Sequence, residues 1–129
     1  MSDPEFLTLA EVLQIHARSL AEHGGMEGMR EPGLVESALA SAKNTFFYGR
    51  GDVFDVAASY AFHLAESQAF IDGNKRTAVA SALIFLARNG CYVRPRTWEL
   101  YLAMIDLTER RLSKTELAAI FRTAAAQLD

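Results

Sequence analysis

The stretch ESQAFIDGNKRTA, residues 66–78, brings an acid, turn-forming residues and two cations together. Asp72 and Gly73 precede a run with helical character, and Lys75 and Arg76 fall in its first turn. The backbone N–H groups at a helix start and the helix dipole stabilise anions. Cations are unfavourable in a first turn unless an anion binds there, so the pattern indicates a phosphate site. The alternative from spacing alone is a turn followed by solvated cations.

The same loop contains a candidate metal ligand and lacks an obvious base. Asp72 can hold Mg²⁺, which prefers one or two carboxylates together with phosphate oxygens, and Phe70 is the expected buried anchor of the loop. Phosphoryl transfer also uses a group that takes the proton of the attacking hydroxyl or positions that hydroxyl. The residue just before the loop is Gln68, whose amide does not titrate. His63 lies about 140° away around a helix, so we do not expect it to replace a base at that position.

Length and composition restrict the fold and the class of function. The 129 residues fit one domain, 1–129, with a single core. The net charge of −3 and the pI of about 5.6 argue against a general nucleic-acid binder. A DNA-binding alternative would have to use Arg94, Arg96, Arg110 and Arg111. No apolar run reaches the ~18 residues of a membrane span, and the start lacks the pattern of a secretory signal. The single cysteine, Cys91, fits a reducing, cytoplasmic setting.

Helix signals recur along the whole chain. Thr8 and Glu11, like Ser113 and Glu116, have the spacing of a capping box. The expected helices follow Thr8, Pro32, Asp52, Gly73, Thr97 and Ser113. The segments 53–65 and 74–90 are apolar nearly all round, so they should form the buried centre of an all-α fold of about six helices. The first of them has one polar stripe, and we expect His63 to bond Ser59 or Asp55 within it.

The segment NTFFYGRGD, residues 44–52, is predicted to be a loop because it contains two glycines among polar residues. Its three consecutive aromatic residues are Phe46, Phe47 and Tyr48. Two interpretations stay open for them. Phe46 or Phe47 folds back on the core, or the loop is a flap that contacts a ligand or partner.

These motifs resemble the Fic/Doc family, and more closely its Doc (death-on-curing) branch of toxin–antitoxin modules. The family pattern runs His-x-Phe-x-Asp/Glu-Gly-Asn-Gly/Lys-Arg, and Phe70, Asp72, Gly73, Asn74, Lys75 and Arg76 match it. The similarity extends to FLTLAEVLQIHARSLAEHGG, REPGLVESALA and SALIFLARNG. Lys75 and Val79 favour Doc, because Fic proteins usually have glycine and arginine at these two places.

The resemblance implies a compact all-α domain whose two central helices are joined by the motif loop. It implies a bacterial, cytoplasmic toxin that transfers the γ-phosphate of ATP, with Mg²⁺, to a hydroxyl of a protein such as elongation factor Tu. Asp72 would bind Mg²⁺, Gly73, Asn74, Lys75 and Arg76 would hold the phosphates, and Phe46, Phe47 and Tyr48 would lie in the target flap. The partner expected to silence it is a small antitoxin.

The chain departs from the family pattern at Gln68, where the motif histidine falls. Loss of a positioned general base typically slows a reaction by ~10²–10⁴-fold. Glutamine can still orient a hydroxyl through its amide oxygen. Three explanations therefore stay open: a natural non-catalytic relative, a selected or introduced change in a toxin, or a glutamine that suffices as positioner. The alternatives to a kinase are a nucleotide- or antitoxin-binding module and a Fic-type AMP-transferase.

Overall fold

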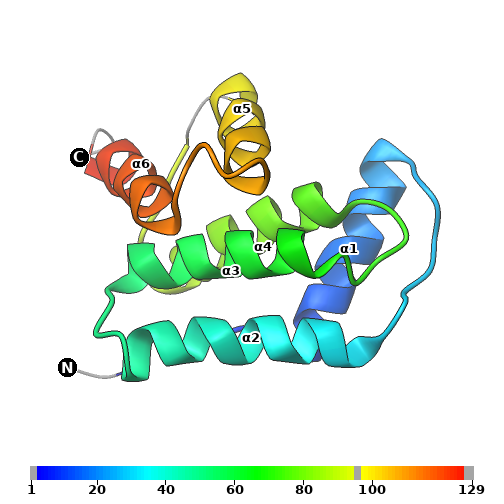
Figure 1. Ribbon diagram of the computed structural model, residues 1–129, viewed down its shortest axis with the longest axis horizontal. Coiled ribbons are helices and arrows are strands. Elements are labelled where there is room, and N and C mark those ends of the chain that lie inside the picture. The colour runs from blue at the N-terminus through cyan, green and yellow to red at the C-terminus, as the bar shows by residue number, and fades with distance from the viewer. Residues whose placement is uncertain (1–2, 95–96, 127–129) are drawn as a thin grey trace.

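The structure, a computed structural model, describes residues 3–94 and 97–126. Within these ranges the chain forms helices α1 (Leu9–His23), α2 (Pro32–Phe47), α3 (Val53–Ser67), α4 (Asn74–Arg88), α5 (Thr97–Thr108) and α6 (Lys114–Ala126). Figure 1 shows α3 and α4 in the middle, with α2 along one side and α5 and α6 on the other. The all-α prediction is therefore confirmed.

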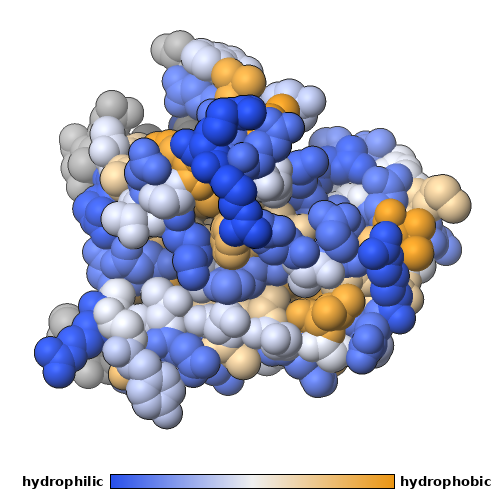
Figure 2. All heavy atoms as spheres, in the orientation of Figure 1, coloured by the Kyte–Doolittle hydropathy of each residue, from blue (hydrophilic) through white to orange (hydrophobic). Residues whose placement is uncertain are grey.

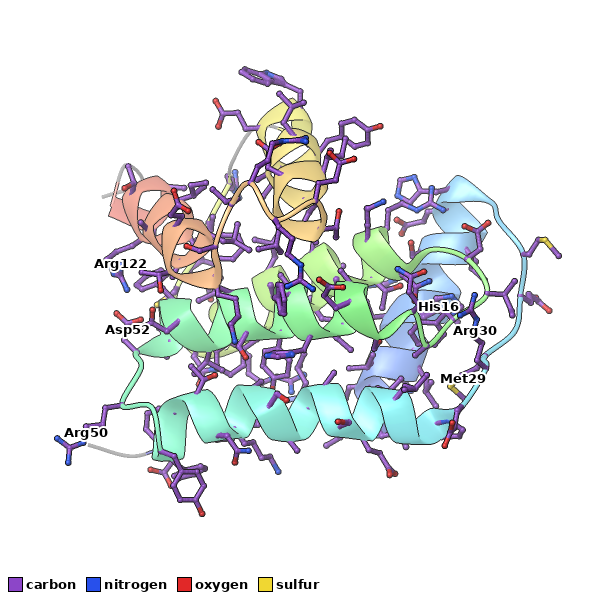
Figure 3. All side chains as sticks on the ribbon, in the orientation of Figure 1. His16, Met29, Arg30, Arg50, Asp52 and Arg122 are labelled. Carbon is purple, nitrogen blue, oxygen red and sulfur yellow. The ribbon has the colours of Figure 1, made fainter. Side chains whose placement is uncertain are left out.

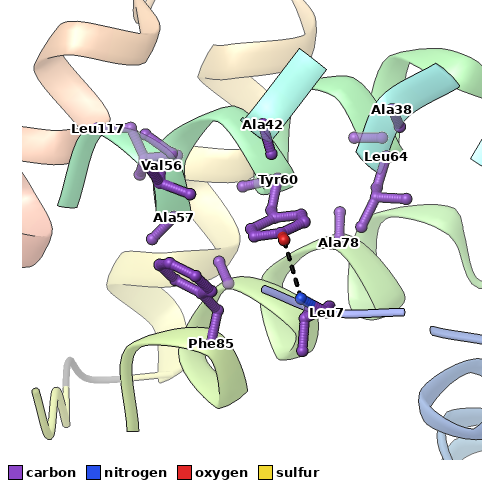
Figure 4. Packing of buried hydrophobic residues seen from close by; sticks show 14 of the residues in the cluster. Leu7, Ala38, Ala42, Val56, Ala57, Tyr60, Leu64, Ala78, Phe85 and Leu117 are labelled. Atoms are coloured by element: carbon purple, nitrogen blue, oxygen red, sulfur yellow. Dashed lines mark hydrogen bonds between the residues drawn. The ribbon is translucent and has the colours of Figure 1, made fainter. Parts of the chain in front are cut away.

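Helix α3 is the centre of the core. It packs against α2, α4, α5 and α6, and a continuous run of its residues, 56–61, is buried. Tyr60 lies between α3 and α4 close to Phe85, with 5.1 Å between ring centroids. Its hydroxyl accepts a hydrogen bond from the backbone N–H of Leu7 at 3.0 Å (Figure 4). Burial of a side chain as large as Phe85 contributes about 1.5–3 kcal/mol, so this layer carries much of the stability.

Side-chain caps fix where three of the helices begin. Thr8 and Glu11 form a capping box at α1, and Ser113 and Glu116 exchange the same two bonds at α6. Asp52 caps α3 by accepting from two backbone N–H groups. Such a cap contributes about 1 kcal/mol, and it depends only on residues close in sequence. The predicted starts of these three helices are confirmed for this reason.

The predicted loop at 44–52 is wrong in its first half, because α2 continues to Phe47. Phe46 packs against the core and meets the Phe6 ring at 6.1 Å, which favours the helical path for this segment. The Thr45 hydroxyl bonds a backbone carbonyl of its own helix and the Ser59 hydroxyl of α3. Phe46 therefore does cover the core, but from a helix and not from a loop.

The polar stripe of α3 also differs from the prediction. No hydrogen bond joins His63 to either of the two residues proposed for it, and its Nε2 lies 3.1 Å from Nζ of Lys114 on α6 instead. Burial and this nearby ammonium group lower the pKa of His63. Arg110 and Arg111 of the DNA-binding alternative make ion pairs with carboxylates, and Arg96 lies outside the described residues. No helix in the described part of the chain is both long and apolar enough to cross a membrane.

Candidate anion and metal site

The motif loop joins the end of α3 to the start of α4. Gln68 ends α3 in the left-handed conformation, with φ 51° and ψ 37°, and Gly73 at φ 80° precedes the first turn of α4. Between them Phe70 is buried, with only 2% of its surface exposed. The expected role of Phe70 as anchor of the loop agrees with this burial. The chain reverses between two packed helices, and its polar residues are left at the surface.

The Asn74 side chain closes the loop from within. Its Oδ1 accepts from the backbone N–H of Phe70 at 3.1 Å, and its Nδ2 donates to the carbonyl of the same residue at 2.9 Å. These two bonds hold the loop against the start of α4. The predicted phosphate contact of Asn74 would therefore come from its backbone N–H and not from its amide side chain.

The Asp72 carboxylate is held by two backbone N–H groups. Oδ2 accepts from Met26 at 3.2 Å and Oδ1 accepts from Gly73 at 2.9 Å. These bonds, that of Met26 first and that of Gly73 second, lower the pKa of Asp72, and the nearby Arg76 adds to the effect. The carboxylate is therefore ionised at neutral pH and has a fixed direction. Carboxylate oxygens in this state are the ligands that Mg²⁺ prefers.

The first turn of α4 presents positive charge beside this carboxylate. No side chain caps its N-terminus, Lys75 is exposed, and Nη2 of Arg76 donates to the Gly24 carbonyl at 3.2 Å. Within the described residues no group of three His, Cys, Asp or Glu side chains could enclose a metal. The donor set thus fits Mg²⁺ held by one carboxylate and by the phosphate oxygens of a nucleotide.

A second loop, residues 24–31 between α1 and α2, pairs with the motif loop. Met29 and Phe70 form an antiparallel bridge, Arg30 donates its N–H to the carbonyl of Ala69 at 2.7 Å, and Ile71 donates to the carbonyl of Gly28 at 3.0 Å. Figure 3 shows Met29 and Arg30 beside the end of α3. The sequence reasoning missed this pairing, although the three glycines between 24 and 28 signal an unusual backbone.

Two histidines of α1 border this region, and the structure changes the interpretation of one of them. From the sequence we interpret His16 as an interface residue and His23 as a cation at the helix end. His16 lies beside the motif loop (Figure 3), and its ring is stacked on that of Phe70 with 3.7 Å between ring centroids. Its Nε2 is 2.8 Å from the backbone oxygen of Asp72. His23 does lie in the last turn of α1, next to Glu22.

Gln68 is exposed at the edge of the site. Its amide nitrogen donates to the carbonyl of Ala65 at 2.9 Å, so the side chain folds back toward the last turn of α3. Position 68 is close enough to border the same groove as Asp72 and Lys75. An amide at this place can orient a hydroxyl but cannot accept its proton.

A groove of about 1200 Å³ runs from the motif loop between α1, α4 and α5. Its apolar walls are Ile15, Val79, Leu83, Ile84, Leu100 and Met104. Charged side chains border its motif-loop end, among them Asp72, Lys75 and Arg76. The site is therefore continuous with a surface that suits an elongated, partly apolar ligand. Figure 2 shows further apolar atoms at the molecule's motif-loop end, where Met26 and Ile71 are exposed.

The aromatic residues proposed for a target flap do not reach this site. Phe46, Phe47 and Tyr48 precede α3, whereas Gln68 and the motif loop follow it (Figure 1). The 15 residues of α3 separate its two ends by about 22 Å. The segment that borders the motif loop is residues 24–31 instead.

Comparison with known proteins gives consistent matches. The family model described as the Fic/DOC family matches residues 6–86. The chain is 38% identical to a protein named "Protein kinase doc" from Escherichia phage P1, over 84 residues that make up 64% of this chain and 67% of the phage protein. It is 40% identical over 90 residues to "Toxin Doc" from Mycolicibacterium smegmatis, covering 67% of this chain and 65% of that toxin. About two thirds of each relative is thus matched.

Proposed function

This chain belongs to the Fic/Doc family, and we propose that it is a Doc-type toxin. In this proposal it transfers the γ-phosphate of ATP to a hydroxyl of a bacterial protein, with elongation factor Tu as the first target to test. The name of the mycobacterial relative supports a toxin, and that of the phage relative supports a kinase. The observation that carries the proposal is the ionised Asp72 beside the uncapped, cationic start of α4.

Each residue of the loop has a separate role in this mechanism. Asp72, fixed by two N–H groups, is the ligand offered to Mg²⁺. Lys75, Arg76 and the backbone N–H groups at the start of α4 hold the phosphate oxygens. Bound there, Mg²⁺ would neutralise charge on the transferred group. Phe70 and Asn74 keep the loop in shape.

Gln68 sets the rate in this mechanism. Its amide oxygen can orient the target hydroxyl, whose proton must leave to solvent or to phosphate because glutamine does not titrate. Phosphoryl transfer depends mainly on positioning and charge stabilisation. We therefore propose slow turnover, about 10²–10⁴-fold below that of the same chain with histidine at this position.

Labelled ATP tests this proposal directly. The chain, Gln68→His and Gln68→Ala are incubated with elongation factor Tu and either γ- or α-labelled ATP. Gln68→His should transfer the γ-label fastest, and Gln68→Ala should fall below the unmodified chain. If folded, nucleotide-bound Gln68→His transfers nothing, the target or the reaction is wrong. If the α-label is transferred, the activity is that of a Fic-type AMP-transferase.

A non-catalytic binding module is the second candidate, and the identity of Gln68 is the observation that favours it. This candidate predicts that Asp72→Ala and Lys75→Ala weaken the binding of Mg²⁺-ATP while no variant forms product, including Gln68→His. The transfer assay separates the candidates, because only the toxin requires turnover, and calorimetry tests the nucleotide binding that both require. Absence of nucleotide binding by the unmodified chain contradicts both.

The groove offers a place for the antitoxin in the same proposal. Its apolar walls between α1, α4 and α5 suit the apolar face of a helical segment, and such a segment would also cover the motif loop. The candidate partner is the product of a short neighbouring reading frame, in the bacterial cytoplasm where both proteins are made. Ile84, 36% exposed on the groove wall, is the residue to change. Ile84→Glu should abolish co-purification of the two proteins without unfolding the chain.

A further inference from the structure

We propose that His16 is a positioning residue for the motif loop. It holds the Asp72–Gly73 peptide so that the Asp72 carboxylate and the start of α4 face the same side. The part of this inference that concerns nucleotide rests on the proposed function, whereas the part that concerns loop geometry does not. His16 belongs to α1 and is far from the motif in sequence, so only the folding of the chain brings it to the motif loop.

Two contacts bind the His16 ring to the loop. The ring lies nearly parallel to that of Phe70, at 10° and with centroids 3.7 Å apart. Its Nε2 is 2.8 Å from the backbone oxygen of Asp72. A carbonyl oxygen only accepts, so Nε2 carries a proton and donates it. Both rings are buried, with 7% of His16 and 2% of Phe70 exposed, so this bond is shielded from water.

The direction of one N–H group follows from this bond. In a trans peptide the carbonyl and the N–H of the next residue point in opposite directions within one plane. When His16 holds the carbonyl of Asp72 toward α1, the N–H of Gly73 must point away from α1. There it donates to Oδ1 of Asp72 at 2.9 Å. His16 thus orients one of the two N–H groups that fix the carboxylate.

The ring also limits where Gly73 can move. A Cβ atom at Gly73 would lie 3.6 Å from Nε2 of His16, so the imidazole borders the space beside Gly73 and an added methyl group would just touch it. Gly73 has φ of 80°, a conformation that other residues rarely adopt. His16 therefore supports the loop at the residue just before α4, and it does so from a helix that packs directly on α4.

The state of the imidazole is the first test, and it uses the unmodified protein. Nitrogen NMR of His16 should show a protonated, hydrogen-bonded Nε2. A neutral ring with a bare Nε2 overturns the proposal. This measurement needs no variant, so it shows whether Nε2 of His16 donates a hydrogen bond even where substitutions impair folding.

Amide hydrogen exchange in the absence of nucleotide is the second test. His16→Phe keeps a ring to stack on Phe70 but removes the donor, and His16→Gln supplies an amide donor. Exchange at Gly73 and Met26 should be about fivefold faster in His16→Phe, as expected for loss of one hydrogen bond, and should be partly restored in His16→Gln. His63→Phe, the same change in a half-buried histidine of α3, should leave these amides unchanged. Equal exchange in His16→Phe and the unmodified chain, or equal acceleration throughout the core helices, overturns the proposal.

Nucleotide binding extends the test to function. His16→Phe should weaken the binding of Mg²⁺-ATP by about fivefold relative to His63→Phe. If the unmodified chain binds no nucleotide, the proposed function fails while the exchange result still decides the role of His16. If nucleotide binds equally well to both variants although exchange differs, His16 shapes the free loop only and its role in the site is refuted.

Discussion

Gly25→Ala is the substitution that most directly tests how Asp72 is held. A Cβ atom at position 25 would lie 2.8 Å from Oδ2 of Asp72 and 3.0 Å from Cδ2 of Leu20. Contacts this short force a movement. Asp72 is the side chain that must turn away, and in doing so it leaves the N–H of Met26, which bonds the same Oδ2.

The adjacent Gly24→Ala is a matched control. Gly24 and Gly25 both have positive φ, 79° and 122°, so alanine at either position introduces backbone strain of about 1–3 kcal/mol. In a protein of this size such strain lowers the melting temperature by about 3–10 °C. A Cβ atom at Gly24 meets nothing within 4 Å. The two variants therefore share the backbone strain and differ in the contacts with Asp72 and Leu20.

Carbon NMR titration of Asp72 measures the difference. The pKa of this carboxyl is lowered chiefly by the N–H of Met26 and next by that of Gly73. In Gly25→Ala the first of these bonds is lost, so the pKa should rise toward its ordinary value. In Gly24→Ala it should stay low. The affinity for Mg²⁺-ATP, measured by calorimetry, should fall further in Gly25→Ala for the same reason.

Equal behaviour of the two variants would refute this reasoning. If the pKa of Asp72 and the affinity for Mg²⁺-ATP change alike in both, backbone strain alone explains the effect, and the loop at 24–31 is a connection without a role in the site. If the pKa of Asp72 is unchanged in both variants, the bond from Met26 does not hold Asp72 in solution.

Three further predictions follow from the contacts that hold the fold. Asn74→Leu removes both backbone bonds across the motif loop and should weaken Mg²⁺-ATP binding by at least tenfold in calorimetry, since two bonds of about 1 kcal/mol each are lost. Tyr60→Phe leaves the buried N–H of Leu7 without a partner and should lower the free energy of unfolding by about 1–3 kcal/mol in urea denaturation. The hydrogen bond from Arg88 and that from Thr8 lower the pKa of Glu11 from 4.5 to about 2. The stabilisation of the fold by ionised Glu11 is therefore present above pH 4.5 and is lost as the pH falls toward 2. In Glu11→Gln, the free energy of unfolding should fall less over that interval.

Much of the fold was predictable because its signals are local. The capping boxes at Thr8 and Ser113 and the apolar runs of α3 and α4 depend on residues within a turn or two of one another. The charge pattern of the motif loop is local as well. Spacing alone therefore indicates an anion site at the start of α4, with a turn followed by solvated cations as the alternative.

The remaining parts of the site come from contacts between distant segments. His16 meets Asp72 only because α1 packs on α4, and no spacing in α1 distinguishes it from an ordinary core histidine. The bridge between Met29 and Phe70 joins two loops that lack strand patterns. Phe46 was placed in a loop by composition, whereas its contact with Phe6 favours a helix. In each case a tertiary contact outweighed the local signal.

The proposed turnover depends on the side chain at position 68, whereas the fold does not. Gln68 has φ 51° and ψ 37°, a left-handed conformation in which histidine is also enriched. Its one hydrogen bond, to the carbonyl of Ala65, lies at an exposed helix end where water can replace it. The fold therefore accepts histidine as readily as glutamine, and nothing in the packing requires the amide. Exchange of Gln68 for His changes the proton chemistry of the site while leaving its scaffold intact, so a difference in turnover between the two reports on catalysis and not on folding.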